Sequence, residues 1–258
     1  MAKSKQSAIA TVKKRIVPVA EVPAYARVLL YGTNGSQKTR TAATGPKHLI
    51  IDANEEGTLS VKNYPDVDVF HAKTWEDIVW AYWFLRSGEH EYESFSIDTI
   101  TNMQAMCLTH TMKEGVDRDP ARDPAMPGGK DYQKVNTLMK KYLIFYRNLP
   151  MHCIFIAQEK QVDTEEGLET EHVPDLSPGA RGTAMACVNF IGHMRVKKVR
   201  SVNKKTKKET SRWVPVMLIG PDDNYVTKDR SFQLGRFVIE PKMSQIIEAA
   251  KHVKEEDE

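Results

Sequence analysis

Short apolar runs recur along the chain, and each is followed by a polar or glycine-containing segment. The runs lie at 26–31, 47–52, 67–70, 94–98 and 152–157. Runs of this length and ending are typical of buried strands. Between them, residues 74–88 and 131–150 carry apolar side chains at helical spacing, and Gly88 is a plausible helix stop. Strands alternating with helices predict an α/β fold, with a mostly parallel sheet flanked by helices on both faces.

The second half of the chain departs from this alternation. Residues 188–202 and 211–220 predict two strands around the turn NKKTKKE, which we expect to form a basic β-hairpin. A last strand at 236–241 and a closing helix follow. The segments 113–130 and 159–182 are polar and contain proline and glycine, so both are expected to be long loops.

The composition bears on the cellular compartment of the protein and on whether its cysteines could bind a metal. The three cysteines, at positions 107, 153 and 187 of 258 residues, are far apart, so they have no metal-ligand spacing. A sparse cysteine count fits a reducing cytosol. No apolar run approaches the roughly 18 residues of a membrane span, and the basic N-terminus does not resemble a signal peptide. We therefore expect a cytoplasmic protein with no membrane partner.

The stretch 28–43, VLLYGTNGSQKTRTAA, has the layout of a strand, a glycine-containing turn and a helix beginning at Lys-Thr. This layout is typical of a phosphate-binding loop, whose backbone N–H groups turn inward to form an anion cradle. The residues expected around the phosphates are Gly32, Thr33, Asn34, Gly35, Ser36, Gln37, Lys38, Thr39 and Arg40. Gln37 stands where the usual pattern has glycine. An ordinary strand-turn-helix junction is the alternative.

Polar residues end three of the predicted strands, where parallel sheets bind their ligands. Glu55 and Glu56 follow the strand 47–52 and could polarise an attacking water, although acidic residues also suit a helix N-terminus. Asp98 could hold Mg²⁺ together with the Thr39 hydroxyl, while Lys38 neutralises the phosphates. Gln158, after the strand 152–157, could sense the γ-phosphate, or simply be a polar strand end.

In the order of these features, the chain resembles the RecA-like ATPases. Among them it resembles most the small, single-domain phage-encoded ATPases that act in single-strand annealing and recombination. The resemblance runs from about residue 26 to 242 and rests on the phosphate loop, IIDANEEG, FSIDTIT, IFIAQ and VTKDR. It implies a RecA-like P-loop NTPase core with ATP and Mg²⁺ as cofactors. The implied domains are a flexible basic arm at 1–22, the ATPase domain at 23–245, and a helix end with the acidic tail EEDE at 246–258.

The resemblance also assigns catalytic roles. RecA proteins carry their catalytic glutamate directly after a similar IDA, where this chain has Asn54, so the role passes to Glu55 or Glu56. Glu56 is favoured because the neighbouring Gly57 permits a close approach to the phosphate. Gln158 matches the glutamine that couples the nucleotide state to DNA binding.

Two basic residues late in the core complete the implied site. Lys228 and Arg230, in VTKDR, resemble a pair that reaches the neighbouring subunit's nucleotide. Such a contact is head-to-tail, so the resemblance implies a homo-oligomeric ring or filament.

Single-stranded DNA is the implied partner, and the segments 113–130 and 159–182 correspond to the two DNA-binding loops. The charges support this assignment only in part. The segment 159–182 is acidic on balance, and the hairpin is more basic than either loop, so the hairpin is the stronger candidate for binding DNA. A solvated hairpin is the alternative. The candidate DNA contacts are Lys113, Arg118, Arg122, Lys130, Lys197, Lys198, Arg200, Lys204, Lys205, Lys207 and Lys208.

Together these features predict an ATP-hydrolysing RecA-like protein that assembles on single-stranded DNA in phage recombination or annealing, in the host cytoplasm. A single-strand-binding protein is a further expected partner. The departures at Gln37 and Asn54 favour an alternative, a non-hydrolysing nucleotide-binding loader or structural protein that recruits a replication partner. A metabolic nucleotide kinase lacks support, because no arginine-rich lid segment follows the core helices.

Overall fold

The computed structural model describes residues 2–54, 57–163, 170–202 and 209–252. Its central sheet is built from β1 (Arg27–Tyr31), β2 (His48–Ala53), β3 (Val67–Ala72), β4 (Ser94–Asp98), β5 (His152–Ala157), β8 (Phe190–Val202), β9 (Glu209–Leu218), β10 (Lys228–Asp229) and β11 (Phe237–Ile239). The order is β11-β9-β8-β1-β5-β4-β2-β3, and β10 also pairs with β8. All pairs from β8 to β3 are parallel, whereas β9, β10 and β11 pair antiparallel. This confirms the predicted mixed α/β fold with a mostly parallel sheet.

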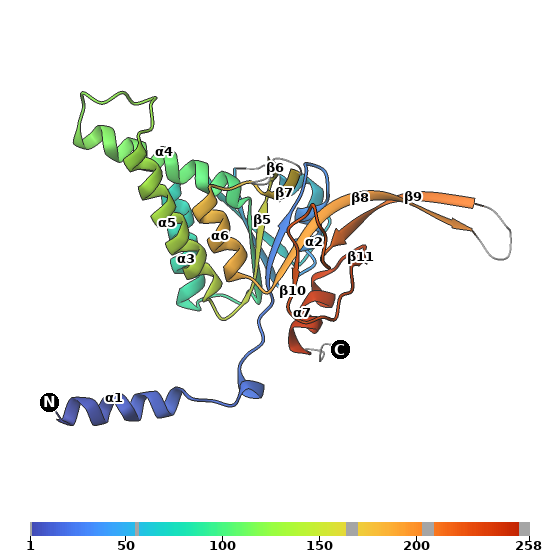
Figure 1. Cartoon of the computed structure of the whole chain (residues 1–258), viewed down its shortest axis with the longest axis horizontal. Coiled ribbons are helices and arrows are strands. Elements are labelled where there is room, and N and C mark those ends of the chain that lie inside the picture. The colour runs from blue at the N-terminus through green and yellow to red at the C-terminus, as the bar shows by residue number, and fades with distance from the viewer. Residues whose placement is uncertain (1, 55–56, 164–169, 203–208, 253–258) are drawn as a thin grey trace.

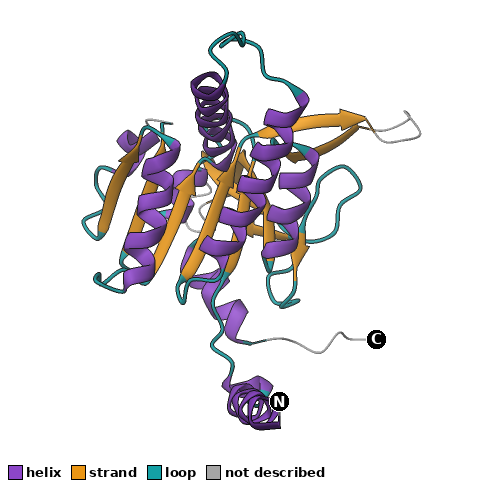
Figure 2. Cartoon of the chain, turned by 90° about the vertical axis from the view of Figure 1, so that its left-hand side faces the viewer, coloured by secondary structure: helices purple, strands orange, loops and turns teal. Residues whose placement is uncertain are grey.

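Helices cover both faces of the sheet. They are α2 (Lys38–Ala42), α3 (Trp75–Ser87), α4 (Ile100–Arg118), α5 (Gly129–Arg147), α6 (Pro178–Cys187) and α7 (Met243–Lys251). Successive residues of a strand point to opposite faces. Leu29 and Tyr31 therefore pack with α3, α4, α5 and α6, while Val28 and Leu30 pack with α2 and α7. Figure 2 looks onto the first of these layers, in front of the strands.

The start and stop of α3 are those that the sequence predicts. Thr74 caps its first turn, because its hydroxyl accepts a bond from the Asp77 N–H and the Asp77 carboxylate accepts one from the Thr74 N–H. Gly88 ends the helix with φ 74°, in the left-handed region that glycine adopts without strain.

The predicted loop at 113–130 is wrong at both ends. Helix α4 continues to Arg118 and α5 begins at Gly129, so only residues 119–128 are irregular. Asp131 holds this connection, because its carboxylate accepts a 2.7 Å bond from the Gly128 N–H and forms an ion pair with Arg122. The proline and glycine content of the segment therefore misplaced both helix boundaries, because it does not show the Arg122–Asp131 pair that holds the connection.

The predicted loop at 159–182 is also wrong. It contains the antiparallel strands β6 (Glu159–Asp163) and β7 (Thr170–Pro174), followed by the first residues of α6. Pro178 lies in the first turn of α6, where the missing N–H of proline costs little. The described prolines and glycines of this segment therefore lie at the end of β7 and in α6 rather than in a long loop.

The N-terminal arm contains helix α1 (Ala2–Arg15), followed by a short 3₁₀ turn, η1 (Val19–Glu21). Alanine, lysine, glutamine and arginine are strong helix formers, which accounts for the helix. Residues 7–24 are all exposed, and α1 lies apart from the sheet (Figure 1). The acidic tail at 255–258 lies outside the described residues.

Within the described part of the chain, each helix is too short or too polar to cross a lipid bilayer.

Candidate nucleotide-binding site

The turn between β1 and α2 has the backbone of an anion cradle. Gly32 and Gly35 have φ values of 150° and 77°, which side-chain-bearing residues rarely adopt. A Cβ at Gly32 would also collide with the backbone oxygen of Met194 on β8. Both glycines are therefore required by geometry.

Gln37 takes the place of the usual glycine in the same conformation. Its φ of 68° lies in the left-handed region, which costs a non-glycine residue about 1–2 kcal/mol. Its side-chain oxygen accepts a long 3.5 Å contact from an Arg40 guanidinium nitrogen. The side chain is thus directed toward Arg40, so glutamine keeps the fold of the loop at the cost of local strain.

Lys38 lies inside this turn rather than in solvent. It is 7% exposed, and its ammonium donates bonds of 2.8 Å to the Gly32 carbonyl and 2.9 Å to the Thr33 carbonyl. The positive charge is therefore held at the centre of the loop, where the sequence places the phosphates.

The end of β4 brings a carboxylate to the start of α2. The Thr39 hydroxyl donates a 2.6 Å bond to the buried Asp98 carboxylate. Strand β5 separates β4 from β1 in the sheet, so the hydroxyl and the carboxylate face each other across it. A hydroxyl and a carboxylate are the hard oxygen ligands that Mg²⁺ prefers, so the donor set fits this ion.

A second carboxylate, which the sequence reasoning missed, lies beside Asp98. Asp52 is its direct partner in the pairing of β2 with β4, and its carboxylate bonds the Nδ1 of His71 at 2.9 Å. The sequence contained a signal for this residue, because IID and SID each place an aspartate at the end of a predicted strand.

These residues surround a cavity of about 410 Å³. It is lined by residues 34–40, Gly57, Ser60, Asp98 and Gln158. The structure thus gathers the phosphate loop, the predicted metal ligands and Gln158 at one site. Glu55 and Glu56 lie outside the described residues. Gly57, which directly follows them, begins the 3₁₀ turn η2 (Gly57–Val61).

Comparison with known families agrees with this arrangement. The family model for the AAA domain matches residues 24–231. The chain belongs to the AAA domain family. Its fold is accordingly of the P-loop NTPase type, and AAA domains in general bind and hydrolyse ATP with Mg²⁺. A search of curated proteins found no match.

In this AAA domain, Glu159, the residue after Gln158, forms hydrogen bonds with two histidines. The Glu159 carboxylate accepts bonds of 2.5 Å from His172 Nδ1 on β7 and 2.7 Å from His193 Nε2 on β8. Burial raises the pKa of Glu159, but the two histidine bonds outweigh it and leave the pKa below its usual value. Burial lowers the pKa of His193. The small β6–β7 sheet is thereby joined to the root of the β8–β9 hairpin.

A second cavity of about 270 Å³ adjoins the phosphate loop of the AAA domain and shares Gln37 and Arg40 with the first. It is further lined by Thr41, Thr44, Tyr64, Trp213, Pro215, Glu240, Pro241 and Lys242. Trp213, on β9, is 66% exposed. No local pattern in the sequence predicts that this tryptophan lies near the loop.

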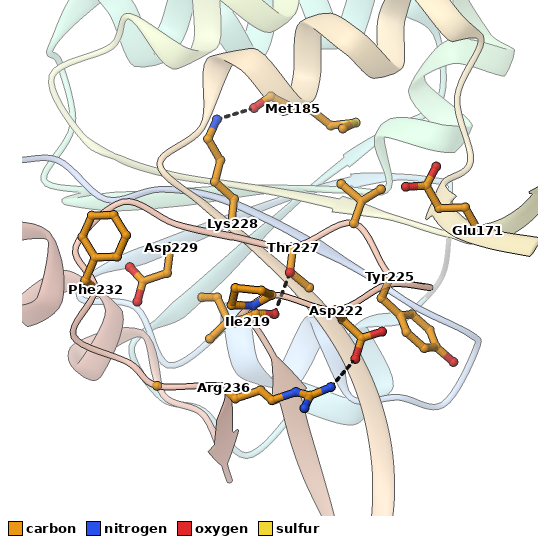
Figure 3. Close-up of a pocket in the computed structure, with 14 residues that line it drawn as sticks. Glu171, Met185, Ile219, Asp222, Tyr225, Thr227, Lys228, Asp229, Phe232 and Arg236 are labelled. Atoms are coloured by element: carbon orange, nitrogen blue, oxygen red, sulfur yellow. Dashed lines mark hydrogen bonds and ion pairs between the residues drawn. The ribbon is translucent and has the colours of Figure 1, made fainter. Parts of the chain in front are cut away.

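The two basic residues of VTKDR differ in their surroundings. Lys228 donates bonds of 2.9 Å to the carbonyls of Met185 and Val188, at the end of α6. Figure 3 shows the bond to Met185. Burial lowers the pKa of Lys228. Arg230 is exposed and follows β10, at the end of the sheet opposite the phosphate loop. In the structure, Lys228 therefore binds carbonyls of its own chain at the end of α6, a contact that the sequence did not predict.

The candidate DNA contacts fall on several elements of the AAA domain. Lys113 and Arg118 are exposed on α4 and Lys130 on α5, whereas Arg122 is ion-paired with Asp131. Lys197, Lys198 and Arg200 are exposed on β8, in the hairpin that extends away from the sheet (Figure 1). Lys204, Lys205, Lys207 and Lys208 lie outside the described residues.

Proposed function

We propose that this AAA domain binds and hydrolyses Mg²⁺-ATP between the phosphate loop and β4, and assembles on single-stranded DNA as a RecA-like recombination or annealing protein of phage type. The observation that carries the nucleotide site is the convergence of Lys38, the Thr39–Asp98 pair and Gln158 on one cavity. Three groups from three segments of the chain supply the charge, the metal ligands and the polar sensor that phosphoryl transfer requires.

Each of these side chains has a distinct task in the proposed reaction. Lys38 exchanges its bonds to the two loop carbonyls for bonds to the β- and γ-phosphates. Thr39 and Asp98 would hold Mg²⁺, which would neutralise charge on the transferred phosphoryl group. Glu56 orients and polarises the attacking water, and Gln158 contacts the γ-phosphate.

The cavity beside the loop is the proposed place for the nucleoside. It adjoins the phosphate loop through Gln37 and Arg40, and it offers the aromatic rings of Tyr64 and Trp213 for contact with a base. ATP binding should therefore change the fluorescence of Trp213.

Head-to-tail assembly is supported by the position of Arg230. It is exposed at the end of the sheet opposite the phosphate loop, so stacked subunits could present it to a neighbour's nucleotide. The exposed cations of β8 support contact with a DNA backbone.

The rival function, a loader that binds nucleotide without hydrolysis, is favoured by Asn54. This residue directly follows β2 and has a left-handed conformation, with φ 58°, at the place where RecA-like proteins carry their glutamate. Phosphate release measured with and without single-stranded DNA separates the two functions. DNA-stimulated release supports the ATPase, and ATP binding without release supports the loader.

The nucleotide site itself is tested by Lys38→Ala. Removing a charge-assisted contact worth about 1.5–3 kcal/mol should weaken ATP binding tenfold or more in calorimetry. The exposed Lys47, whose ammonium pairs with Glu93, supplies the control Lys47→Ala. If both variants lost ATP affinity equally, or if neither lost any, the assignment of Lys38 would be contradicted.

A further inference from the structure

Three cations crowd around one exposed aromatic ring at the edge of the sheet. Arg195, Lys197 and Arg236 place their charged groups 5.4, 5.1 and 5.5 Å from the centre of the Phe237 ring. Phe237 is 42% exposed. An aromatic face attracts cations, but three like charges beside a single ring also repel one another.

Strand pairing explains how residues 40 positions apart share this surface. Arg195 pairs with Val216 on β9, and Val216 pairs with Ile239 on β11. Directly paired residues, and residues two apart in a strand, lie on the same face of a sheet. Arg195, Lys197, Ile239 and Phe237 therefore line one face of the three strands, and Ile239 is exposed as well.

The acidic residue in contact with this group compensates only part of its charge. Asp222 pairs with Arg236 at 3.0 Å, on the rim of a pocket of about 660 Å³ (Figure 3). Lys197 is exposed, and the Arg195 Nε is buried without a hydrogen-bond partner. Three cations set against this one carboxylate favour a ligand that carries several negative charges.

We propose that Arg195, Lys197, Arg236 and Phe237 form a binding platform for single-stranded nucleic acid, with the cations on the phosphodiester backbone and the Phe237 ring stacked against a base. This proposal rests on the proposed DNA-binding function and locates its contact on one face of the hairpin root. An aromatic ring bordered by cations is the combination that binds single strands with little sequence preference. An acidic polypeptide would satisfy the cations but would make no use of the ring.

The platform is tested by fluorescence anisotropy of the full chain with a labelled oligo(dT) and with an abasic oligomer of equal length. Phe237→Leu removes the ring but keeps apolar volume, and it should weaken oligo(dT) binding about fivefold or more while leaving the abasic oligomer unaffected. Phe237→Tyr should restore binding. Lys197→Gln should weaken both oligomers and reduce the slope of log K against log salt by about 0.7.

Lys198→Gln is the matched control, because Lys198 is also exposed but points to the opposite face of β8. It should change affinity less than Lys197→Gln does, and all variants should melt at the wild-type temperature. Equal losses at the two lysines, or a Phe237→Leu variant that binds oligo(dT) like wild type, would overturn the platform and leave DNA binding itself standing. A wild-type chain that binds polyglutamate but not oligo(dT) would overturn both proposals.

Discussion

The Thr39 hydroxyl and the Asp98 carboxylate meet at 2.6 Å although 59 residues separate them in the chain. Thr39 lies in the first turn of α2 and Asp98 is the last residue of β4, so each is positioned by a different element. Their bond joins the phosphate loop to the sheet at the point where Mg²⁺ is proposed to bind.

Asp98→Asn keeps the volume of the side chain but removes its negative charge. Because Mg²⁺ is held by charged oxygens, we expect ATP affinity in the presence of Mg²⁺ to fall tenfold or more. ATP affinity in EDTA should stay near the wild-type value, since the metal does not contribute there. Calorimetry with and without Mg²⁺ measures both, and Asp66→Asn, at an exposed carboxylate, is the control. If Mg²⁺ raised the ATP affinity of Asp98→Asn as much as it raises that of the wild type, Asp98 would be excluded as a metal ligand.

Gln37→Gly should relieve the left-handed strain at the start of α2. The gain of about 1–2 kcal/mol is partly offset by the greater freedom of glycine in the unfolded chain, about 0.5–1 kcal/mol. We therefore expect a small rise in the free energy of unfolding, measured by urea titration, and ATP binding at least as tight as in wild type. A sharp loss of ATP affinity would instead assign a nucleotide contact to the Gln37 side chain.

Glu56→Gln should separate ATP binding from turnover. An amide keeps the size of the carboxylate but cannot act as a base, so binding should persist while phosphate release stops. Glu55→Gln is the matched comparison. If only Glu55→Gln were inactive, the role would move one residue, and normal hydrolysis by both variants would leave the reaction without either base.

The buried His48 should make the protein sensitive to acid. Its ring nitrogens bond the hydroxyls of Ser94 and Ser96 at 2.7 and 2.9 Å, and burial lowers its pKa to about 3. The unfolded chain, with a pKa near 6.5, therefore binds a proton more readily than the folded one. The stabilisation is complete above pH 6.5 and is lost as pH falls toward 3, at a cost of about 2 kcal/mol by about pH 5.

Urea titrations at several pH values test this, with His48→Gln as the comparison. The amide can still bond both serines but does not titrate in this range, so its free energy of unfolding should fall less steeply with acid. Glu159 and His193, whose folded pKa values are also lowered, should leave a residual slope of the same sign in both proteins. Parallel pH curves for the two proteins would contradict the assignment to His48.

The sequence by itself determined the features that depend on neighbouring residues. The strands at 94–98 and 152–157, the cap and stop of α3, and the phosphate loop with Lys38 inside it all arise from local hydrophobic period and local backbone conformation. Gln37 was recognised as unusual for the same local reason. Its left-handed φ explains why glycine is the usual residue there.

Only the tertiary structure decided which of these segments meet. The order of β1, β5 and β4 places Asp98 against Thr39, and the pairing of β8 with β9 brings Trp213 to the rim of the loop. The hydrogen bonds of Glu159 with His172 and His193, and the Arg122–Asp131 pair that shortens the predicted loop, likewise join residues that no local pattern links. Strand order and register are fixed by burial over the whole sheet, whereas a sequence pattern reports only a residue's own neighbourhood.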